Sequence, residues 1–228
     1  MRSALVTGGS SGIGLAIARM LRDEGYALTL AARMPEKLAA AADELGAASI
    51  VTDVRDEKDC EHAVAAHVER FAGLDVLVNS AGVGVSGGID QDVKHIDLQL
   101  DVNLRGLILV TRAALRHLRR SRGLIVNLSS IAGTVPAPLL PVYAATKAAV
   151  ISLTRSLNET LDADGVRVHA LCPGFVHTPM TSFTGIPGDA LIQPEDCAEV
   201  VRMLLRLSPR ARVPQVVIER VGATDGVA

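Results

Sequence analysis

Short apolar runs alternate with amphipathic stretches along almost the whole of this chain. The apolar runs, rich in Val, Leu, Ile and Ala, predict strands at 3–7, 26–32, 48–52, 74–78, 124–128, 167–171 and 213–218. Hydrophobic residues at helical spacing predict helices over 13–22, 36–45, 57–70, 92–119, 143–161 and 195–207. Apolar strands alternating with helices are typical of an α/β fold, so we predict a Rossmann-type, doubly wound parallel sheet with helices on both faces.

The chain has 228 residues, of which 49% are hydrophobic, and this is enough to bury a sizeable core. No tract rich in Ser, Gly or Pro and no block of like charges interrupts the alternation. We therefore expect residues 1–228 to form a single domain.

Composition also bounds the class of protein. The net charge of -2 argues against a surface for nucleic acid. Cys60, Cys172 and Cys197 are odd in number and widely spaced, and the histidines lack the spacing of metal ligands, so neither disulfides nor a metal site is expected. The first strand begins close to Met1, and no apolar run approaches the ~18 residues of a membrane span. We expect a cytoplasmic protein that does not associate with membranes.

The first apolar run ends in a glycine-rich turn, Gly8 to Gly14, which leads into a helix. Glycines let the backbone approach a diphosphate closely, and the amides at the start of the helix hold negative charge. The second run ends in Ala32 and Arg33 instead of an acidic residue. An acid at this place takes the adenosine ribose hydroxyls, whereas an arginine accommodates a 2′-phosphate, so Arg33 favours NADP(H). An exposed arginine that opens the next helix is the alternative interpretation.

A second candidate for chemistry lies between Gly123 and Ala149. Tyr143 and Lys147 are four residues apart and share one face if this segment is helical. A cation within a few Å favours a phenolate, so Lys147 is predicted to lower the pKa of Tyr143 from about 10. Ser129 and Ser130 follow a buried strand, where α/β proteins place ligands. These groups indicate a site that binds and protonates a carbonyl oxygen with Tyr143 as general acid/base, although a Tyr and a Lys also share this spacing by chance on many helices.

These motifs and several others resemble those of the short-chain dehydrogenase/reductase family, in its compact single-domain branch. The resemblance runs from Leu5 to about Met180. In chain order it rests on Thr7–Gly14 (TGxxxGxG), Asp53-Val54, Asn79–Gly82 (NNAG in the family), Asn103, Ser130, Tyr143 with Lys147 (YxxxK) and Pro173–Thr178 (PGxxxT). Each motif is modest alone, but together, in the same order and with the same spacing, they are highly specific.

The resemblance implies an NADP(H)-dependent oxidoreductase that interconverts a ketone or aldehyde and an alcohol by hydride transfer. Ser130 would hold the carbonyl oxygen, and Tyr143 would exchange the proton. Lys147 would lower the phenol pKa and bond the nicotinamide ribose, and Asn103 would anchor a water that relays protons to Lys147. The implied cofactor-binding residues are Gly8, Ser10, Ser11, Gly12, Ile13, Gly14, Arg33, Asp53, Val54, Asn79, Ala81, Gly82, Tyr143, Lys147, Pro173, Gly174, Val176 and Thr178.

Departures from the family pattern adjust these expectations. Ser11 stands where many NADP-preferring relatives carry a basic residue, so NADP(H) is expected to be preferred with NAD(H) still possible. Ser80 replaces the second Asn of NNAG, whose expected role is a structural hydrogen bond, so this replacement does not change the expected function. The substrate-covering segment, about 179–193, is short, which predicts an open pocket. The ending Glu219–Gly222 replaces the frequent DGG, so the family's subunit contacts there do not carry over.

The expected substrate pocket is mostly apolar and lacks an Arg or Lys to hold a carboxylate or phosphate, which predicts a small neutral carbonyl or alcohol substrate. Its expected lining is Ser86, Ala132, Pro138, Leu139, Val176, Met180 and Phe183. The Ala-rich face of the Tyr143 helix suits close packing of helices, and relatives commonly associate through the Tyr143 and Asn103 helices, so a homodimer or homotetramer is expected. Packing of these small residues inside one subunit is the alternative interpretation.

Two other functions on the same fold stay open. A non-catalytic NADP(H)-binding sensor tends to lose the Tyr or the Lys, whereas both are present here. A lyase of the halohydrin dehalogenase type does not need the phosphate-binding glycines and usually carries Arg in place of Lys147. Dependence of turnover on the cofactor separates the three cases.

Overall fold

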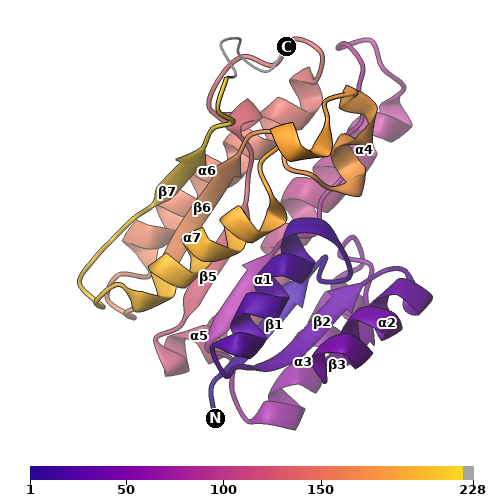
Figure 1. Ribbon diagram of the computed structural model, residues 1–228. Coiled ribbons are helices and arrows are strands. Elements are labelled where there is room, and N and C mark those ends of the chain that lie inside the picture. The colour runs from indigo at the N-terminus through magenta and orange to yellow at the C-terminus, as the bar shows by residue number, and fades with distance from the viewer. Residues whose placement is uncertain (223–228) are drawn as a thin grey trace.

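The computed structural model describes residues 1–222, which contain one seven-stranded sheet flanked by helices (Figure 1). The strands are β1 (Ser3–Thr7), β2 (Ala27–Ala32), β3 (Ala48–Val51), β4 (Val76–Asn79), β5 (Leu124–Leu128), β6 (Arg167–Pro173) and β7 (Gln215–Ile218). They run parallel in the order β3-β2-β1-β4-β5-β6-β7. The predicted Rossmann-type, doubly wound sheet is confirmed.

The strand order places a crevice at the carboxyl ends of β1 and β4. The chain winds outward from β1 to β3, returns to β4 beside β1, and then winds outward to β7. In the register, Thr7 of β1 lies beside both Ala31 of β2 and Asn79 of β4. Loops that leave these strand ends therefore meet at one edge, where doubly wound sheets bind ligands.

Helices cover both faces of the sheet. They are α1 (Gly12–Asp23), α2 (Pro35–Leu45), α3 (Glu57–Phe71), α4 (Val93–Leu100), α5 (Leu107–Ser121), α6 (Pro141–Thr160) and α7 (Pro194–Arg206). Figure 1 shows α1 and α7 together in front of the sheet, and with α2 they pack on one core, which includes Ile17, Leu38 and Val201. A second core, which includes Val64 of α3 and Leu118 of α5, lies on the other face. Of the helices in the described part of the chain, none is long and apolar enough to cross a membrane.

The central strands are fully buried and the outer strands are not. Every residue of β1, β4 and β5 is buried, whereas β3 and β7 consist of half-buried and exposed residues. This explains the sequence pattern, because strands covered on both faces are apolar throughout. The strands β3 and β7 form the two edges of the sheet.

The helical stretch predicted over 92–119 is confirmed, but the type of helix changes within it. A π-helical turn, Asp101–Gly106, separates α4 from α5. Gly106 ends this turn against Val54, where an added Cβ would lie 2.8 Å from Val54 Cγ2 and 2.9 Å from its carbonyl oxygen. The wider turn accommodates this close approach and holds Asn103 on its buried side, 1% exposed.

One histidine in the core makes folding sensitive to acid. His67 of α3 is fully buried, with Nδ1 2.8 Å from Thr29 Oγ1 and Nε2 3.1 Å from Ser3 Oγ. Burial lowers the pKa of His67 to about 4. The folded protein therefore resists protonation of a group that takes up a proton near pH 6.5 when unfolded.

We expect the free energy of unfolding to fall as pH decreases from about 6.5 to about 4. In this window the unfolded chain binds the extra proton, and the difference in pKa corresponds to about 3 kcal/mol at the acid end. Urea unfolding at pH 7.0 and 4.5 measures the loss for the wild type, His67→Gln and His62→Gln. His67→Gln should show a clearly smaller pH-dependent loss, whereas His62, exposed on the same helix, should not matter. Equal losses in all three proteins would contradict the assignment to His67.

Candidate active site

Hydrogen bonds join the ends of β1 and β4 at the base of the crevice. The Thr7 hydroxyl accepts from the Ser80 amide at 3.2 Å and from the Ala81 amide at 3.3 Å. Gly8 follows with φ of 66°, and a Cβ there would lie 2.8 Å from the Ser80 carbonyl. The left-handed conformation and the close approach both require glycine. The glycine turn predicted from the sequence therefore packs directly on the loop after β4.

The glycine turn presents the N-terminus of α1 to the crevice. Ser11 precedes the helix without a side-chain capping bond, and the first turn carries no acidic residue. A Cβ on Gly14 would lie 2.4 Å from the Gly8 carbonyl oxygen, so the turn and the helix are in contact. The first amides of α1 are thus open to an anion that the helix dipole favours. These residues fit the diphosphate of a dinucleotide.

Charged side chains gather beyond the ends of β2 and β3. Arg33 is exposed directly after β2. Asp53, after β3, is 2.6 Å from Arg55, and the hydrogen bond from Arg55, together with the charge of Arg33, lowers the pKa of the Asp53 carboxyl. Val54 lies buried between them and the π-helical turn. The structure brings Arg33 and Asp53 together and adds Arg55, which no sequence motif singled out.

Asn79 lies in the core beneath the crevice. Its Nδ2 donates to Thr111 Oγ1 at 3.0 Å and to Asn127 Oδ1 at 2.9 Å, and the residue is 3% exposed. Asn79 is one of the predicted cofactor-binding residues, but its side chain links β4 to β5 and to α5.

Asn103 holds the loop that follows β4. Its Oδ1 accepts from the Val83 amide at 2.8 Å, and its Nδ2 donates to the Val83 carbonyl at 2.9 Å and to Thr146 Oγ1 at 3.2 Å. Gly82 passes between Asn103 and Lys147, since its Cβ would lie 3.4 Å from Asn103 Oδ1 and 3.6 Å from Lys147 Nζ. Asn103 thus links the loop after β4 to α6.

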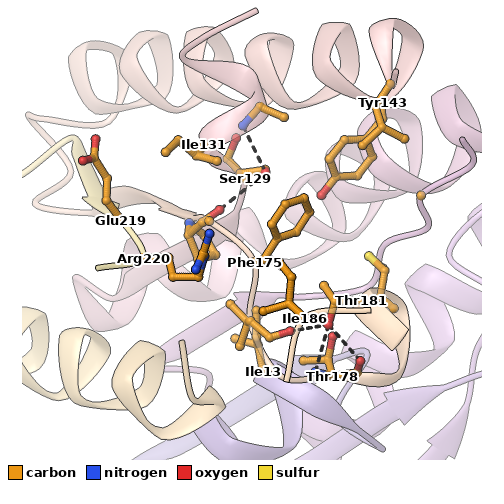
Figure 2. A pocket seen from close by; sticks show the side chains of 18 of the residues that line it. Ile13, Ser129, Ile131, Tyr143, Phe175, Thr178, Thr181, Ile186, Glu219 and Arg220 are labelled. Atoms are coloured by element: carbon orange, nitrogen blue, oxygen red, sulfur yellow. Dashed lines mark hydrogen bonds between the residues drawn. The ribbon is translucent and has the colours of Figure 1, made fainter. Parts of the chain in front are cut away.

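Ser129, Ser130 and Tyr143 line one cavity, in which Figure 2 shows Ser129 and Tyr143. Ser129 Oγ donates to the Lys147 carbonyl at 2.8 Å and so fixes the end of β5 to α6. Ser130 Oγ accepts from the Ala132 amide at 3.2 Å and interacts with Tyr143. A hydroxyl and a phenol from separate elements therefore face the same cavity, as the sequence predicts.

The predicted lowering of the Tyr143 pKa is wrong for the protein alone. Burial raises the pKa of the phenol, and the hydrogen bond with Ser130 opposes this only in part. The Lys147 ammonium does not reverse the shift: its Nζ donates to the Leu128 carbonyl at 2.8 Å and lies 5.5 Å from the Tyr143 ring centroid. Lys147 is 5% exposed, and burial lowers its own pKa to about 8. At neutral pH the phenol is therefore protonated.

Thr178 connects the loop after β6 with the glycine turn. A Cβ on Gly12 would lie 3.1 Å from Thr178 Cγ2, and Ile13 and Thr178 line the same cavity as Tyr143. Thr178 also begins a short 3-10 helix, Pro179–Thr184, within the predicted substrate loop. The crevice thus continues from the anion site at α1 into the cavity that holds the phenol.

The cavity has a volume of about 480 Å³. Five of the seven residues expected at the substrate line it: Ser86, Ala132, Val176, Met180 and Phe183. Pro138 and Leu139 instead line a smaller adjoining cavity, which shares Ser86, Leu140, Phe175 and Phe183 with the first. The exposed fractions of Met180, 44%, and Phe183, 63%, agree with the open pocket predicted from the short loop.

The expectation that no Arg or Lys lines the pocket is wrong. Glu219 and Arg220, in the segment just after β7, are among its lining residues (Figure 2). In the sequence, the segment Glu219–Gly222 is recognisable only as a departure from the DGG ending of the family. Its place in the pocket follows from β7 lying beside β6, with Ile218 in register with Pro173, and no local sequence pattern indicates that neighbour relation.

The known proteins that this chain matches are described as oxidoreductases or dehydrogenases. The family model described as short chain dehydrogenase matches residues 2–185. An uncharacterised oxidoreductase of Staphylococcus epidermidis is 36% identical over 222 residues, which are 96% of either chain. An alcohol dehydrogenase of the archaeon Thermococcus sibiricus, solved with 5-hydroxy-NADP, is 33% identical with a TM-score of 0.90 over 97% of both chains. A serine dehydrogenase solved with NADP+ is 30% identical with a TM-score of 0.87, covering 94% of this chain and 93% of its own.

Proposed function

This oxidoreductase belongs to the short-chain dehydrogenase family, and we propose that it interconverts a ketone or aldehyde and an alcohol with NADP(H), using Tyr143 as the general acid/base. The observation that carries the proposal is that Tyr143 and Ser130 line one cavity with Ile13 and Thr178, beside the anion site at α1. The cofactor supplies the hydride when it is bound. The chain supplies the proton, the orientation and the exclusion of water.

The side chains divide the work of carbonyl reduction. Ser130 donates a hydrogen bond to the carbonyl oxygen and orients it towards Tyr143. The phenol, kept protonated at neutral pH by its raised pKa, gives its proton to that oxygen as negative charge develops. Lys147, whose pKa of about 8 makes its proton easy to release, restores the proton to the phenol. Asn103 holds the Val83 loop against α6, the helix that carries Lys147, and its Oδ1 would accept a further hydrogen bond from the relay water.

The cofactor is proposed to lie across the crevice from β2 to β6. Its diphosphate would meet the amides of Gly8, Ser10, Ser11, Gly12, Ile13 and Gly14, and its adenosine part Arg33, Asp53 and Val54. Its nicotinamide part would meet Tyr143 and Lys147 together with Asn79, Ala81, Gly82, Pro173, Gly174, Val176 and Thr178. The exposure of Arg33 beside Asp53 supports NADP(H) over NAD(H), because the guanidinium is free to meet a 2′-phosphate.

We expect the protein to bind NADPH more tightly than NADH, and Arg33→Ala to remove most of the difference. Loss of one charge-assisted contact to a phosphate corresponds to roughly 10- to 100-fold in Kd. Titrations followed by the fluorescence of the reduced nicotinamide measure both constants. Arg70→Ala, which removes an exposed arginine at the far end of α3, should leave the ratio unchanged. Equal Kd values for the two nucleotides, unaltered in Arg33→Ala, would exclude the NADP assignment.

A homodimer or homotetramer formed through α5 and α6 is also proposed. The outer side of α6 exposes small residues, Ala145 and Ala148, and Ile108 of α5 is 41% exposed. Small side chains let helices approach closely, which supports packing between copies at this face.

A further inference from the structure

Arg220 brings a positive charge to a largely apolar pocket. Of the described residues that line the cavity, two carry a charge, Glu219 and Arg220. Glu219 is exposed, and Figure 2 shows its carboxylate turned away from Arg220. In this view Arg220 lies between Glu219 and Phe175, and both Arg220 and Phe175 line the cavity. The pocket therefore has a cationic side on the β7 wall, across from the phenol.

The Arg220 guanidinium has unused hydrogen-bonding capacity. Its Nε is buried and has no partner among the described residues. Two other arginines of the C-terminal part are paired, since Arg206 lies 3.0 Å from Glu24 and Arg212 lies 2.8 Å from Glu159. A buried donor without an acceptor costs roughly 1–3 kcal/mol, so an acceptor that enters the pocket is favoured. A guanidinium presents its donors in a planar fork, which suits a carboxylate that it can bind through two parallel hydrogen bonds.

We propose that Arg220 selects substrates that carry a carboxylate, so that the reaction interconverts an oxo acid and the corresponding hydroxy acid. The proposal rests on the proposed function, because the oxo group must lie at Ser130 and Tyr143 while the carboxylate reaches Arg220. Val135, Ile186 and Phe183 line the cavity with these groups and accommodate the carbon chain. A single guanidinium matches one carboxylate charge, whereas a phosphate dianion usually meets more than one cation.

The test compares 2-, 3-, 4- and 5-oxo acids with their methyl esters as substrates for NADPH oxidation. The esters keep the ketone and the carbon chain but lack the charge. For at least one chain length we expect kcat/KM of the acid to exceed that of its ester roughly 10-fold or more, with the difference mainly in KM. In Arg220→Gln this acid-to-ester ratio should fall by roughly 10- to 100-fold, and Arg220→Lys should restore part of it. Arg210→Gln, which removes an exposed arginine outside the pocket lining, should keep the wild-type ratio.

Other outcomes overturn the proposal. If the wild type prefers every ester to its acid, Arg220 does not select carboxylates. The same conclusion follows if Arg220→Gln leaves the acid-to-ester ratio of kcat/KM unchanged. In both cases reduction of the esters would still agree with the proposed function. Turnover of no oxo acid of any length also overturns it. If, in addition, no ester is reduced and NADPH does not bind, the proposed function itself fails.

Discussion

Replacing Tyr143 with phenylalanine is expected to lower kcat for carbonyl reduction by roughly 10²- to 10⁴-fold, the range in which a general acid contributes. The variant keeps the ring that lines the cavity and removes only the oxygen that donates the proton. Tyr143 is only one of the groups proposed to meet the cofactor, and the anion site at α1 lies on separate elements, so the Kd of NADPH should change far less than kcat. Steady-state reduction of a carbonyl panel and NADPH titration measure the two quantities separately.

The second tyrosine of the chain provides a matched control. Tyr26 is buried near Arg2, whose Nη1 lies 3.3 Å from the phenol oxygen, and it lines no part of the cavity. Tyr26→Phe should therefore retain kcat. If Tyr143→Phe kept wild-type kcat with the same cofactor dependence, the phenol would not be the acid. Loss of NADPH binding in that variant would instead point to a mainly structural role.

Replacing Gly133 with alanine is expected to disturb both stability and catalysis, because Gly133 touches the backbone of α6. A Cβ there would lie 2.7 Å from the Lys147 carbonyl carbon, 2.8 Å from the Ala148 amide nitrogen and 2.9 Å from the Lys147 carbonyl oxygen. Backbone atoms cannot rotate away as a side chain can, so the helix must shift. Overpacking of this kind costs about 1–3 kcal/mol.

The shift should also reach the chemistry, since α6 carries both Tyr143 and Lys147. A displacement near 1 Å at reacting groups corresponds to roughly 10²-fold in rate. Urea unfolding gives the loss of stability, and kcat measured well below the unfolding transition gives the catalytic loss. Gly73→Ala is the control, because a Cβ at Gly73 meets nothing within 4 Å. Wild-type values for Gly133→Ala in both measurements would show that this contact is more adaptable than its distances imply.

The alternation of elements could be predicted from the sequence because parallel strands covered on both faces are apolar throughout. The predicted strand 124–128 coincides with β5, and 3–7 with β1. The π-helical turn could not be predicted in this way, since the close approach of Gly106 to Val54 joins residues that are far apart in the sequence. Amphipathic spacing on either side of the turn is the same as in one long helix.

The candidate site also combines features that the sequence could predict with features that it could not. Motifs with fixed spacing identified Ser130, Tyr143 and Lys147. These residues come together because they lie at the end of one strand, β5, and on the next long helix, α6. The raised pKa of Tyr143 depends on how much of the surrounding protein excludes water, and spacing carries no information on burial. Arg220 enters the pocket through the order of β6 and β7 in the sheet, a long-range relation that its neighbours in sequence do not reveal.

The position of β7 at the edge of the sheet separates the two halves of the site in local stability. The glycine turn is anchored on β1 and β4, which are buried and paired on both sides, whereas β7 pairs with β6 alone among the strands of residues 1–222. Edge strands open at a lower free-energy cost than central strands, and substitutions in them disturb fewer contacts. The wall that carries Arg220 can therefore loosen, or diverge among relatives, while the glycine turn that is proposed to bind the dinucleotide stays folded. Substrate preference can thus change in evolution without rebuilding the cofactor site.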